Sequence, residues 1–368
     1  MITATALNKR LIVVLGMHRS GTSALTRALT ALDIDIGNDF IPSIPAVNAK
    51  GFWEDAEINN LNIKLLQAIN TDWFKLSPIR KNELLEKNNL RYEAIQLLEK
   101  KFNDRDLFAV KDPRFCILLP FWKSVFTELN LKVDYIFAIR NPLSVSLSLL
   151  KRDSFPHELN YLMWLSYVIH SFIEARNNIK LVVDFDRLIN NPKKELFRIA
   201  RALELPFNTN SKNIKEYTDL FLDKKLRHSE FSLDELNADP FIPKDIFLLY
   251  NCLLRLSKDE LSMDSESVHS VFLNALEKIN YFDSGFRLID LFQDLNIKAR
   301  DLITKHEGEI TNYKTQNIKL ADLIREREAD IQHFIYIIDE MKLSNSWKIT
   351  MPMRYIKDSL IRMLNTIK

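Results

Sequence analysis

Apolar residues gather in four short runs in the first part of the chain, with polar turns between them. Each run is long enough for a buried strand, and the runs cover residues 11–15, 107–110, 133–139 and 181–183. Helical periodicity fills the intervals, as in residues 93–98 and 162–173. Strands that alternate with helices are typical of a parallel sheet with helices on both faces. The pattern therefore predicts an α/β fold built on a doubly wound parallel sheet.

The residues that follow each run carry the candidate chemistry. Residues 16–23 follow the first run, residues 111–114 the second, residues 140–142 the third, and Asp184 with Asp186 the fourth. Ligands of open α/β sheets bind beyond the carboxyl ends of the strands. The sequence therefore predicts that these turns form one site at one edge of the sheet.

The turn after the first run has the features of a phosphate-binding loop. Glycine lets the backbone bend and approach a ligand, and the N–H groups at the start of the next helix form an anion site. The spacing from Gly16 to Gly21 is that of the nucleoside-triphosphate P-loop, but Thr22 stands where that motif has its lysine. Arg19 can bind an oxygen pair of a phosphate or sulfate without replacing this lysine. The loop therefore favours an anionic nucleotide other than ATP with magnesium.

Composition narrows the function classes. The chain has 368 residues with 51 basic and 49 acidic side chains, a balance that gives no support for a nucleic-acid partner. Cys116 and Cys252 are too few for a disulfide framework and lack metal-ligand spacing, so we expect buried thiols in a reducing compartment. No apolar run reaches the roughly 20 residues of a membrane span, and the run before Gly16 lacks the features of a secretion signal. We expect a cytoplasmic protein.

Two segments resemble the nucleotide-binding motifs of a known family. Residues 16–23 and 140–148 resemble the two motifs of sulfotransferases that use 3′-phosphoadenosine 5′-phosphosulfate as donor. The second motif of that family is an arginine, commonly followed by Asn-Pro or His-Pro, with a serine eight positions after it; Arg140 and Ser148 have this spacing. Residues 111–113, Lys-Asp-Pro, resemble a triplet near the sulfate in sulfotransferases that act on tyrosine. The resemblance covers about residues 10–205 and is strongest to bacterial sulfotransferase-like proteins.

The resemblance implies a fold of the P-loop nucleotide-binding type and a role for each motif. Arg140 and Ser148 would bind the 3′-phosphate of the donor. The 5′-phosphosulfate would lie in the loop, whose binding residues are Gly16, Arg19, Ser20, Gly21, Thr22 and Ser23. Arg19 and Lys111 would supply positive charge to the moving sulfuryl group and its bridging oxygen. The reaction demands no metal ion.

The base that takes the proton of the acceptor hydroxyl is less clear from the sequence, which offers Glu54, Asp55, His18, Asp112 and His157. We favour Glu54 because several similar sulfotransferases use a glutamate downstream of the phosphosulfate loop. The alternative for Glu54 is an exposed carboxylate at the start of a helix from Ala56. His18 lies inside the loop, where it is either the next candidate base or a residue that only shapes the loop.

Each motif also has a simpler interpretation. Arg19 could be a surface charge on an ordinary turn, and Arg140 with Ser148 could belong to the start of an ordinary helix. Lys111 could form a structural ion pair with Asp112 or another carboxylate. A role for Arg114 is less certain than one for Lys111. For the acidic residues after the fourth run, Asp184 and Asp186, we prefer the interpretation as caps of the helix near Leu188.

The sequence changes in character after the motifs. Residues 1–210 are expected to form the nucleotide-binding domain, residues 211–294 a helical extension, residues 295–343 a coiled coil, and residues 344–368 a tail. Apolar residues over about five heptads predict the coiled coil, and Asn317 at an a position favours a homodimer. His306 and Arg327 interrupt the seam, whose positions are Ile303, Ile310, Tyr313, Asn317, Leu320, Ile324, Ile331, Phe334, Ile338 and Met341. The alternative is a helix folded back onto the catalytic domain.

The tail begins with a short motif. Residues 344–354 resemble a Ser-x-Ser-Trp-Arg/Lys-x-Thr-x-Pro-x-Arg segment that follows coiled coils in bacterial enzymes of cell-surface polysaccharides, including glycosyltransferases. Residues 355–364 have the pattern of an amphipathic helix with basic side chains, which suits a membrane surface or the groove of a partner enzyme. The alternative is a helix that covers the protein's own core.

The motifs and the resemblance together imply a cytoplasmic sulfotransferase, with the inner face of the membrane as a further location. The expected acceptor is a hydroxyl of a carbohydrate or lipid-linked glycan. Three alternatives stay open: a nucleotide-binding scaffold with a decayed site, a peptide-tyrosine acceptor, and a P-loop kinase, against which the missing lysine argues. Acceptor pockets lie in loops that vary with function, so the sequence leaves the acceptor itself open.

Overall fold

The computed structural model describes residues 9–43, 50–85, 87–222 and 229–366. Its contacts divide the chain into two compact units, Met1–Leu291 and Phe292–Lys368. The first unit contains the sheet and every motif of the predicted site, and the second contains the predicted coiled coil and tail. Each unit is described by itself.

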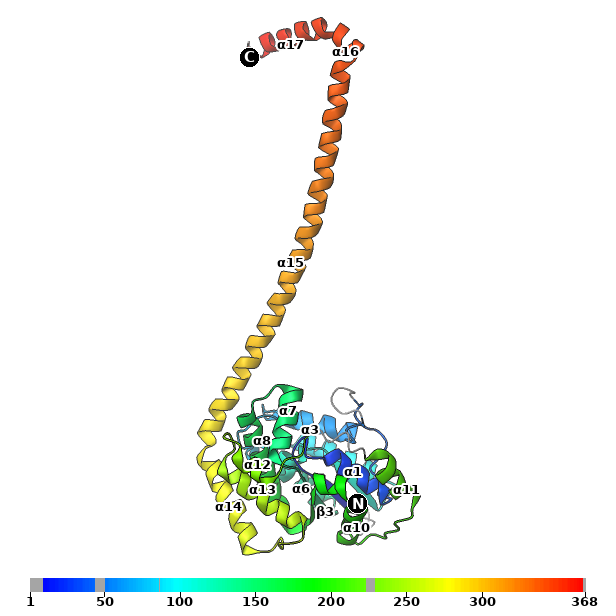
Figure 1. The fold of residues 1–368 in the computed structure, drawn as a ribbon, viewed down its shortest axis with the longest axis vertical. Helices are drawn as coiled ribbons and strands as arrows, with labels where there is room; N and C mark the ends of the chain where they lie inside the picture. Colours follow the sequence, from blue (N-terminus) through cyan, green and yellow to red (C-terminus); the bar gives the residue numbers. More distant parts are fainter. Residues whose placement is uncertain (1–8, 44–49, 86, 223–228, 367–368) are drawn as a thin grey trace. The chain divides into compact units, whose positions relative to one another are not determined.

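Four parallel strands form the centre of the first unit (Figure 1). They are β1 (Arg10–Leu15), β2 (Leu107–Lys111), β3 (Lys132–Ile139) and β4 (Ile179–Asp184), in the spatial order β2-β1-β3-β4. Each coincides with one of the four predicted apolar runs. Parallel pairing with neighbours on both sides places the end of β1 at the middle of the carboxyl edge, between the ends of β2 and β3.

The two faces of the sheet bury separate apolar cores. Leu11 and Val13 of β1 pack in one core, and Ile12 and Val14 between them pack in the other, because successive side chains of a strand point to opposite faces. The first core is covered by α3 (Ala56–Ala68), α5 (Asn88–Lys101), α6 (Phe115–Glu128) and α8 (His157–Ala175). The second core is covered by α1 (Thr22–Ala31), α9 (Phe185–Asn190), α10 (Pro192–Ala202) and α11 (Lys212–Glu216). The predicted doubly wound fold is confirmed.

The segment expected as a helical extension also packs on the first unit. It contains α12 (Leu233–Ala238), α13 (Lys244–Ser257) and α14 (Glu266–Tyr281), of which α13 lies against β4 and α14 against α8. Phe272 of α14 stacks on Phe172 of α8 with 3.7 Å between the ring centroids. Asp290, near the end of the unit, accepts hydrogen bonds from the backbone N–H groups of Leu76 and Ser77 at 2.8 and 2.9 Å. These contacts make residues up to Leu291 part of one compact body.

Asp184 ends β4 and caps α9. One of its carboxylate oxygens accepts the backbone N–H of Arg187 at 3.0 Å, which confirms the predicted cap for Asp184. The same prediction is wrong for Asp186, which lies inside the helix, in its first turn. The other oxygen, Oδ2, is buried and has no hydrogen-bond partner among the residues that the structure describes. Burial raises the pKa of Asp184 to about 7, because the charged form loses its hydration.

The second unit is helical throughout its described part. It begins within α15, which runs from Asp283 to Leu343 as one helix of 61 residues. The apolar positions of the predicted heptad, Ile303, Ile310, Tyr313, Leu320, Ile324, Ile331, Phe334, Ile338 and Met341, are all exposed on this helix. A single continuous helix with an exposed apolar stripe is what a coiled-coil strand requires, and self-association itself stays a prediction.

The tail motif forms the joint between two helices, α16 (Asn345–Ile349) and α17 (Met351–Thr366). Ser344 caps α16 by accepting the backbone N–H of Trp347 at 3.3 Å. The guanidinium of Arg354 lies 3.8 Å from the Trp347 ring centroid and donates to Thr350 Oγ1 at 2.6 Å and to the Trp347 carbonyl. The serine, tryptophan, threonine and arginine of the motif thus fix the joint between the helices. Among the described residues, no helix has the length and apolar character to span a bilayer.

We expect Asp184→Asn to flatten the pH dependence of stability. Because folding raises the pKa of this carboxyl from 3.8 to about 7, its stabilising contribution is fully present below the lower value and is lost as the pH rises through the higher one. Asparagine keeps the capping oxygen and cannot ionise. The Tm of the variant, followed by circular dichroism between about pH 5 and 8, should therefore fall less than that of the wild type.

The exposed Asp264 provides the control, because Asp264→Asn should leave the wild-type pH dependence intact. Parallel Tm curves for wild type and Asp184→Asn would contradict the assignment of this titration to Asp184.

Candidate functional site

The loop after β1 needs its two glycines for different reasons. Gly16 has φ +148°, and a Cβ there would lie 2.7 Å from the carbonyl oxygen of Ala138 on β3. Gly21 has φ +84° and its added Cβ would collide with the ring of Phe185. Arg19 adopts the left-handed region as well, with φ 68°. The loop is therefore wound tightly against the ends of the neighbouring strands.

Helix α1 starts from this loop with an open N-terminus. Gly21 occupies the cap position, where it supplies no side-chain acceptor for the first N–H groups of the helix. Ser20 is buried, and its Oγ has no hydrogen-bond partner within the described ranges. Thr22 is buried at the first helical position, and Ser23 Oγ donates to the carbonyl of Phe52 at 2.9 Å. A helix N-terminus without a side-chain cap, next to the buried Ser20 hydroxyl, suits an anionic ligand.

Arg19 joins the two motifs. Its Nε donates to Oγ of Ser148 at 2.8 Å, across 129 residues of sequence. Ser148 lies on α7 (Pro142–Asp153), which Asn141 caps by accepting the N–H of Leu143. Burial, with the charges of Arg152 and Arg140, lowers the pKa of Arg19 to about 10, so the guanidinium stays charged at neutral pH. The interpretation of Arg19 as an ordinary surface charge is therefore wrong.

Arg140 completes this side of the site from the end of β3. Its guanidinium donates to the carbonyl oxygen of Arg19 at 3.4 Å and to that of Ser229 at 3.2 Å, and it lies 4.8 Å from the ring centroid of Phe185. The side chain of Asn141 donates to the carbonyl of Phe231 at 2.9 Å. The sequence analysis missed the segment around residues 229–231, because its contacts with the second motif use carbonyl groups that any residue type carries.

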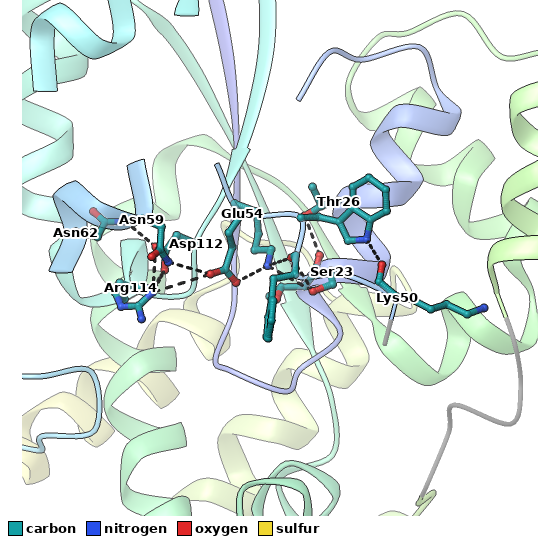
Figure 2. Close-up of polar contacts among 12 residues, drawn as sticks. Ser23, Thr26, Lys50, Glu54, Asn59, Asn62, Asp112 and Arg114 are labelled. Carbon is teal, nitrogen blue, oxygen red and sulfur yellow. Dashed lines mark hydrogen bonds and ion pairs between the residues drawn. The ribbon is translucent and has the colours of Figure 1, made fainter. Parts of the chain in front are cut away.

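Lys111 and Glu54 form a buried ion pair on the other side of the loop. Lys111 Nζ lies 2.6 Å from Glu54 Oε1, with the two side chains 0% and 7% exposed. The same ammonium donates to the Phe52 carbonyl and, at 3.4 Å, to Ser23 Oγ. Figure 2 shows Glu54 between Ser23 on one side and Asn59, Asp112 and Arg114 on the other. The loop, β2 and the segment before α3 therefore meet at this pair.

The exposed-carboxylate alternative for Glu54 is wrong. Asp55, not Glu54, caps α3, where it accepts the N–H groups of Glu57 and Ile58 at 3.1 Å. Glu54 instead turns inward and is 5% exposed. The ion pair that the structural interpretation of Lys111 expects is present, with Glu54 as the partner, and the catalytic role of Lys111 stays a prediction.

Two asparagines of α3 bind the acidic groups beside Lys111. Asn59 Nδ2 donates to Glu54 Oε2 at 3.1 Å and to Asp112 Oδ2 at 3.2 Å, and Asn62 Nδ2 donates to the same Asp112 oxygen at 3.1 Å (Figure 2). Arg114 binds both oxygens of Asp112 through its NH1 group, at 3.1 and 3.2 Å. Sequence analysis missed both asparagines, although buried amides three residues apart on one helix face are a readable signal.

The electrostatics of the site distinguish the candidate bases. Burial raises the pKa of Glu54, an effect that the nearby Lys111 opposes and Asp112 reinforces. Burial lowers the pKa of His18 well below its ordinary value, and the charges of Arg152, Arg114, Lys111 and Arg19 lower it further. Burial therefore disfavours the protonated form of His18 and favours the protonated form of Glu54.

The other histidine and acid candidates are engaged elsewhere. His157 Nδ1 contacts Ser146 Oγ at 2.7 Å, and the carboxylate of Asp112 is held by the two asparagines and Arg114. Cys116 is buried and accepts the N–H of Gly16 at 3.1 Å; burial raises the pKa of its thiol to about 12, as expected of a structural cysteine. Glu54 is thus the candidate base that pairs with Lys111, a candidate cation at the end of β2.

Comparison with solved structures finds low similarity to three sulfotransferase structures. The sulfotransferase domain from the curacin biosynthetic pathway is 14% identical over 57% of this chain and 77% of its own, with a TM-score of 0.35. The corresponding domain of the Synechococcus PCC 7002 olefin synthase is 17% identical over 74% and 96%, with a TM-score of 0.34. A Mycobacterium tuberculosis H37Rv sulfotransferase is 14% identical over 63% and 74%, with a TM-score of 0.32.

A search of curated proteins finds no match. The family described as the sulfotransferase family matches residues 12–209, which is more than half of the chain. This range includes residues 16–23 and 140–148, the Lys111–Glu54 pair and all of the sheet except the first two residues of β1. The chain therefore belongs to the sulfotransferase family.

Proposed function

We propose that this sulfotransferase moves a sulfuryl group from 3′-phosphoadenosine 5′-phosphosulfate to a hydroxyl of a carbohydrate or lipid-linked glycan. The observation that carries the proposal is the meeting of the two motifs, where Arg19 hydrogen-bonds Ser148 at 2.8 Å and the buried Lys111–Glu54 pair lies beside the same loop. Phosphate and sulfate oxygens would replace the serine and carboxylate oxygens as partners of these cations.

The donor site divides between the two motifs. The open N-terminus of α1 and the loop from Gly16 to Ser23 would bind the 5′-phosphosulfate, and Arg140 with Ser148 would bind the 3′-phosphate. Arg140 already packs against the ring of Phe185 and two carbonyl oxygens, so its guanidinium is held in position before a ligand arrives. Pre-positioned donors lose little entropy when they bind an anion.

Transfer would proceed in one displacement at sulfur. The acceptor oxygen bonds to sulfur while the bond from sulfur to the bridging phosphate oxygen breaks, and the acceptor proton passes to the Glu54 carboxylate. The products are a sulfate ester and 3′-phosphoadenosine 5′-phosphate. Lys111 would turn from Glu54 to the bridging oxygen and neutralise the charge that develops there, which releases Glu54 to accept the proton. A base with a raised pKa is better matched to this task at neutral pH.

The glycan acceptor and the location rest on the tail. Helix α17 follows the joint that the motif forms. Its apolar side chains recur on one face: Met353, Ile356, Leu360 and Met363. By helix periodicity Arg362 lies on the opposite face, and Lys357 lies at the edge of the apolar face. This arrangement supports a cytoplasmic enzyme that associates with the inner membrane face or with an enzyme of polysaccharide synthesis. A scaffold with a decayed site, a tyrosine acceptor and a kinase are the alternatives that the experiments below separate.

Donor binding is the first prediction. We expect 3′-phosphoadenosine 5′-phosphate to raise the Tm by preferential binding to the folded state, and ATP with magnesium to raise it far less, because the loop lacks the P-loop lysine. In calorimetry, Arg140→Ala should weaken binding of the bisphosphate by about 1–3 kcal/mol, the range for a lost charge-assisted contact. A stronger response to ATP with magnesium would move the protein to the kinase class.

The second prediction concerns the base. Glu54→Gln keeps the shape of the side chain and removes its proton affinity, so sulfuryl transfer should fall by about 10²–10⁴-fold. Affinity for the bisphosphate should not fall, because Lys111 gains freedom to contact the anion. The assay follows radiolabelled sulfate from the donor onto a panel of glycans.

The exposed Glu93 on α5 gives the matched control, Glu93→Gln, which should transfer sulfate at the wild-type rate. Full activity of Glu54→Gln would assign the base to another residue, with His18 next. Tight nucleotide binding without transfer to a glycan, lipid or peptide hydroxyl would favour the decayed scaffold.

The third prediction concerns the coiled coil. The exposed apolar stripe of α15 should pair with a second copy, with Asn317 matched across the axis. Sedimentation should show a dimer for the full chain and a monomer for a chain that ends at Leu295. The shorter chain keeps Asp290 and its two backbone contacts, so its Tm should match that of the full protein. A monomeric full-length protein, or aggregation of the shorter chain, would contradict self-association.

A further inference from the structure

Arg152 is a cation of the site region to which the proposed donor site assigns no role. It lies in the last turn of α7, four residues after Ser148, and its side chain is 18% exposed. Its Nε donates to Asp153 Oδ2 at 2.8 Å. Its two terminal NH2 groups make no hydrogen bond to any residue that the structure describes. The guanidinium therefore retains the pair of donors that binds an oxyanion in a forked arrangement.

The position of this guanidinium is fixed by an aromatic ring. Its central carbon lies 5.1 Å from the ring centroid of Trp73, which makes a cation–π contact. The same indole packs against the imidazole of His18, with 4.6 Å between ring centroids. His18 belongs to the phosphate-binding loop, so Trp73 connects Arg152 directly to that loop. The Tyr167 hydroxyl donates to the Trp73 carbonyl at 2.8 Å and holds the residue in place.

Charge and burial agree with this position. Arg152 is the charge with the largest effect on the pKa of both His18 and Arg19, which places it beside the loop that would hold the phosphosulfate. The buried Nε2 of His18 has no hydrogen-bond partner in the described part of the chain. A cation with two unused donor groups and a residue with an unpaired ring nitrogen thus both contact one indole.

The surroundings of Arg152 also offer apolar faces. Trp73, Phe74 and Phe155 form a cluster whose ring centroids are 5.7 to 5.9 Å apart, and all three side chains are partly buried against the core. Aromatic faces next to a few polar groups are typical of pockets for organic ligands, and they pack well on the apolar face of a sugar ring. None of these three residues belongs to a motif that the donor requires.

We propose that Arg152, Trp73 and Phe155 form an acceptor subsite that selects a sugar carrying a negatively charged group, a carboxylate or a phosphate, near the hydroxyl that receives the sulfuryl group. This inference rests on the proposed function and deepens it. Arg152 would bind the oxyanion through its terminal NH2 groups, the aromatic rings would contact the sugar, and the acceptor would be held beside His18 and the loop. Arg152 is a specificity residue in this arrangement and takes no part in the proton transfer.

The test compares charged and neutral sugars in matched pairs. The probes are p-nitrophenyl glucuronide against p-nitrophenyl glucoside for the carboxylate, and glucose 6-phosphate against glucose for the phosphate. Radiolabelled sulfate transfer from the donor is measured with the full-length protein, and binding of each sugar is measured by calorimetry on protein saturated with 3′-phosphoadenosine 5′-phosphate. Wild type should prefer the charged member of at least one pair, and the pair that shows the preference identifies the oxyanion.

Variants of Arg152 then test whether this side chain causes the preference for the charged sugar. Arg152→Met keeps the length and apolar stem of the side chain. It should raise KM for the charged sugar by about tenfold or more, while KM for the neutral sugar and kcat stay nearly unchanged. Arg152→Lys should recover part of the preference, since it restores the charge without the fork. Lys151→Met is the matched control. Lys151 directly precedes Arg152 on α7 and is exposed, so this variant should behave as wild type.

Three outcomes decide the inference. Loss of 3′-phosphoadenosine 5′-phosphate affinity in Arg152→Met would assign Arg152 to the donor site and overturn the subsite. Equal treatment of charged and neutral sugars by wild type, in transfer and in binding alike, would also overturn it. If sulfate is transferred to none of the sugars but a charged sugar binds in an Arg152-dependent way, the subsite stands and the proposed transfer function fails.

Discussion

The buried pair of Lys111 and Glu54 is the interaction on which the arrangement of the site depends. Both side chains are almost fully removed from water. In such a buried environment an unpaired charge would cost much free energy. Removing one partner of such a pair typically costs about 3–5 kcal/mol, because the other charge is left uncompensated. Lys111 is at the end of β2 and Glu54 in the segment before α3, so their attraction closes the site across the edge of the sheet.

The parallel sheet explains why so few residues are needed to build the rest of the candidate site. All four strands end at the same edge, and β1 lies between β2 and β3, so the loop that follows β1 emerges between Lys111 and Arg140. Helices on both faces bury the strands, and the polar groups of the site gather at the carboxyl ends. The charges at that edge are then stabilised by one another, by the asparagines of α3 and by helix termini, in place of water.

Sequence patterns predicted the parts of the molecule that depend on local chemistry. The strands follow from short apolar runs, the loop from two glycines with hydroxyls, and the Asp184 cap from a carboxylate at the start of a helix. Contacts between distant segments were harder to foresee. The roles of Asn59 and Asn62 depend on Asp112, about fifty residues away, and Glu54 was favoured through family resemblance because nothing near it in the sequence indicates burial. The position of Arg152 over Trp73 likewise appears only in the folded chain.

The close approach of Gly16 to β3 has a consequence for how this site can change. The Cα of Gly16 leaves no room for a side chain against the carbonyl and Cβ of Ala138, which lies two residues before Arg140. The loop for the 5′ end of the proposed donor and the arginine for its 3′ end are thus mounted on backbones in direct contact, and one cannot shift without the other. Ala138 carries no reactive group, yet its small size sets the spacing between the two halves of the site. The geometry of the two motifs is therefore adjusted as one rigid unit, and variation in specificity must arise in the segments that surround it.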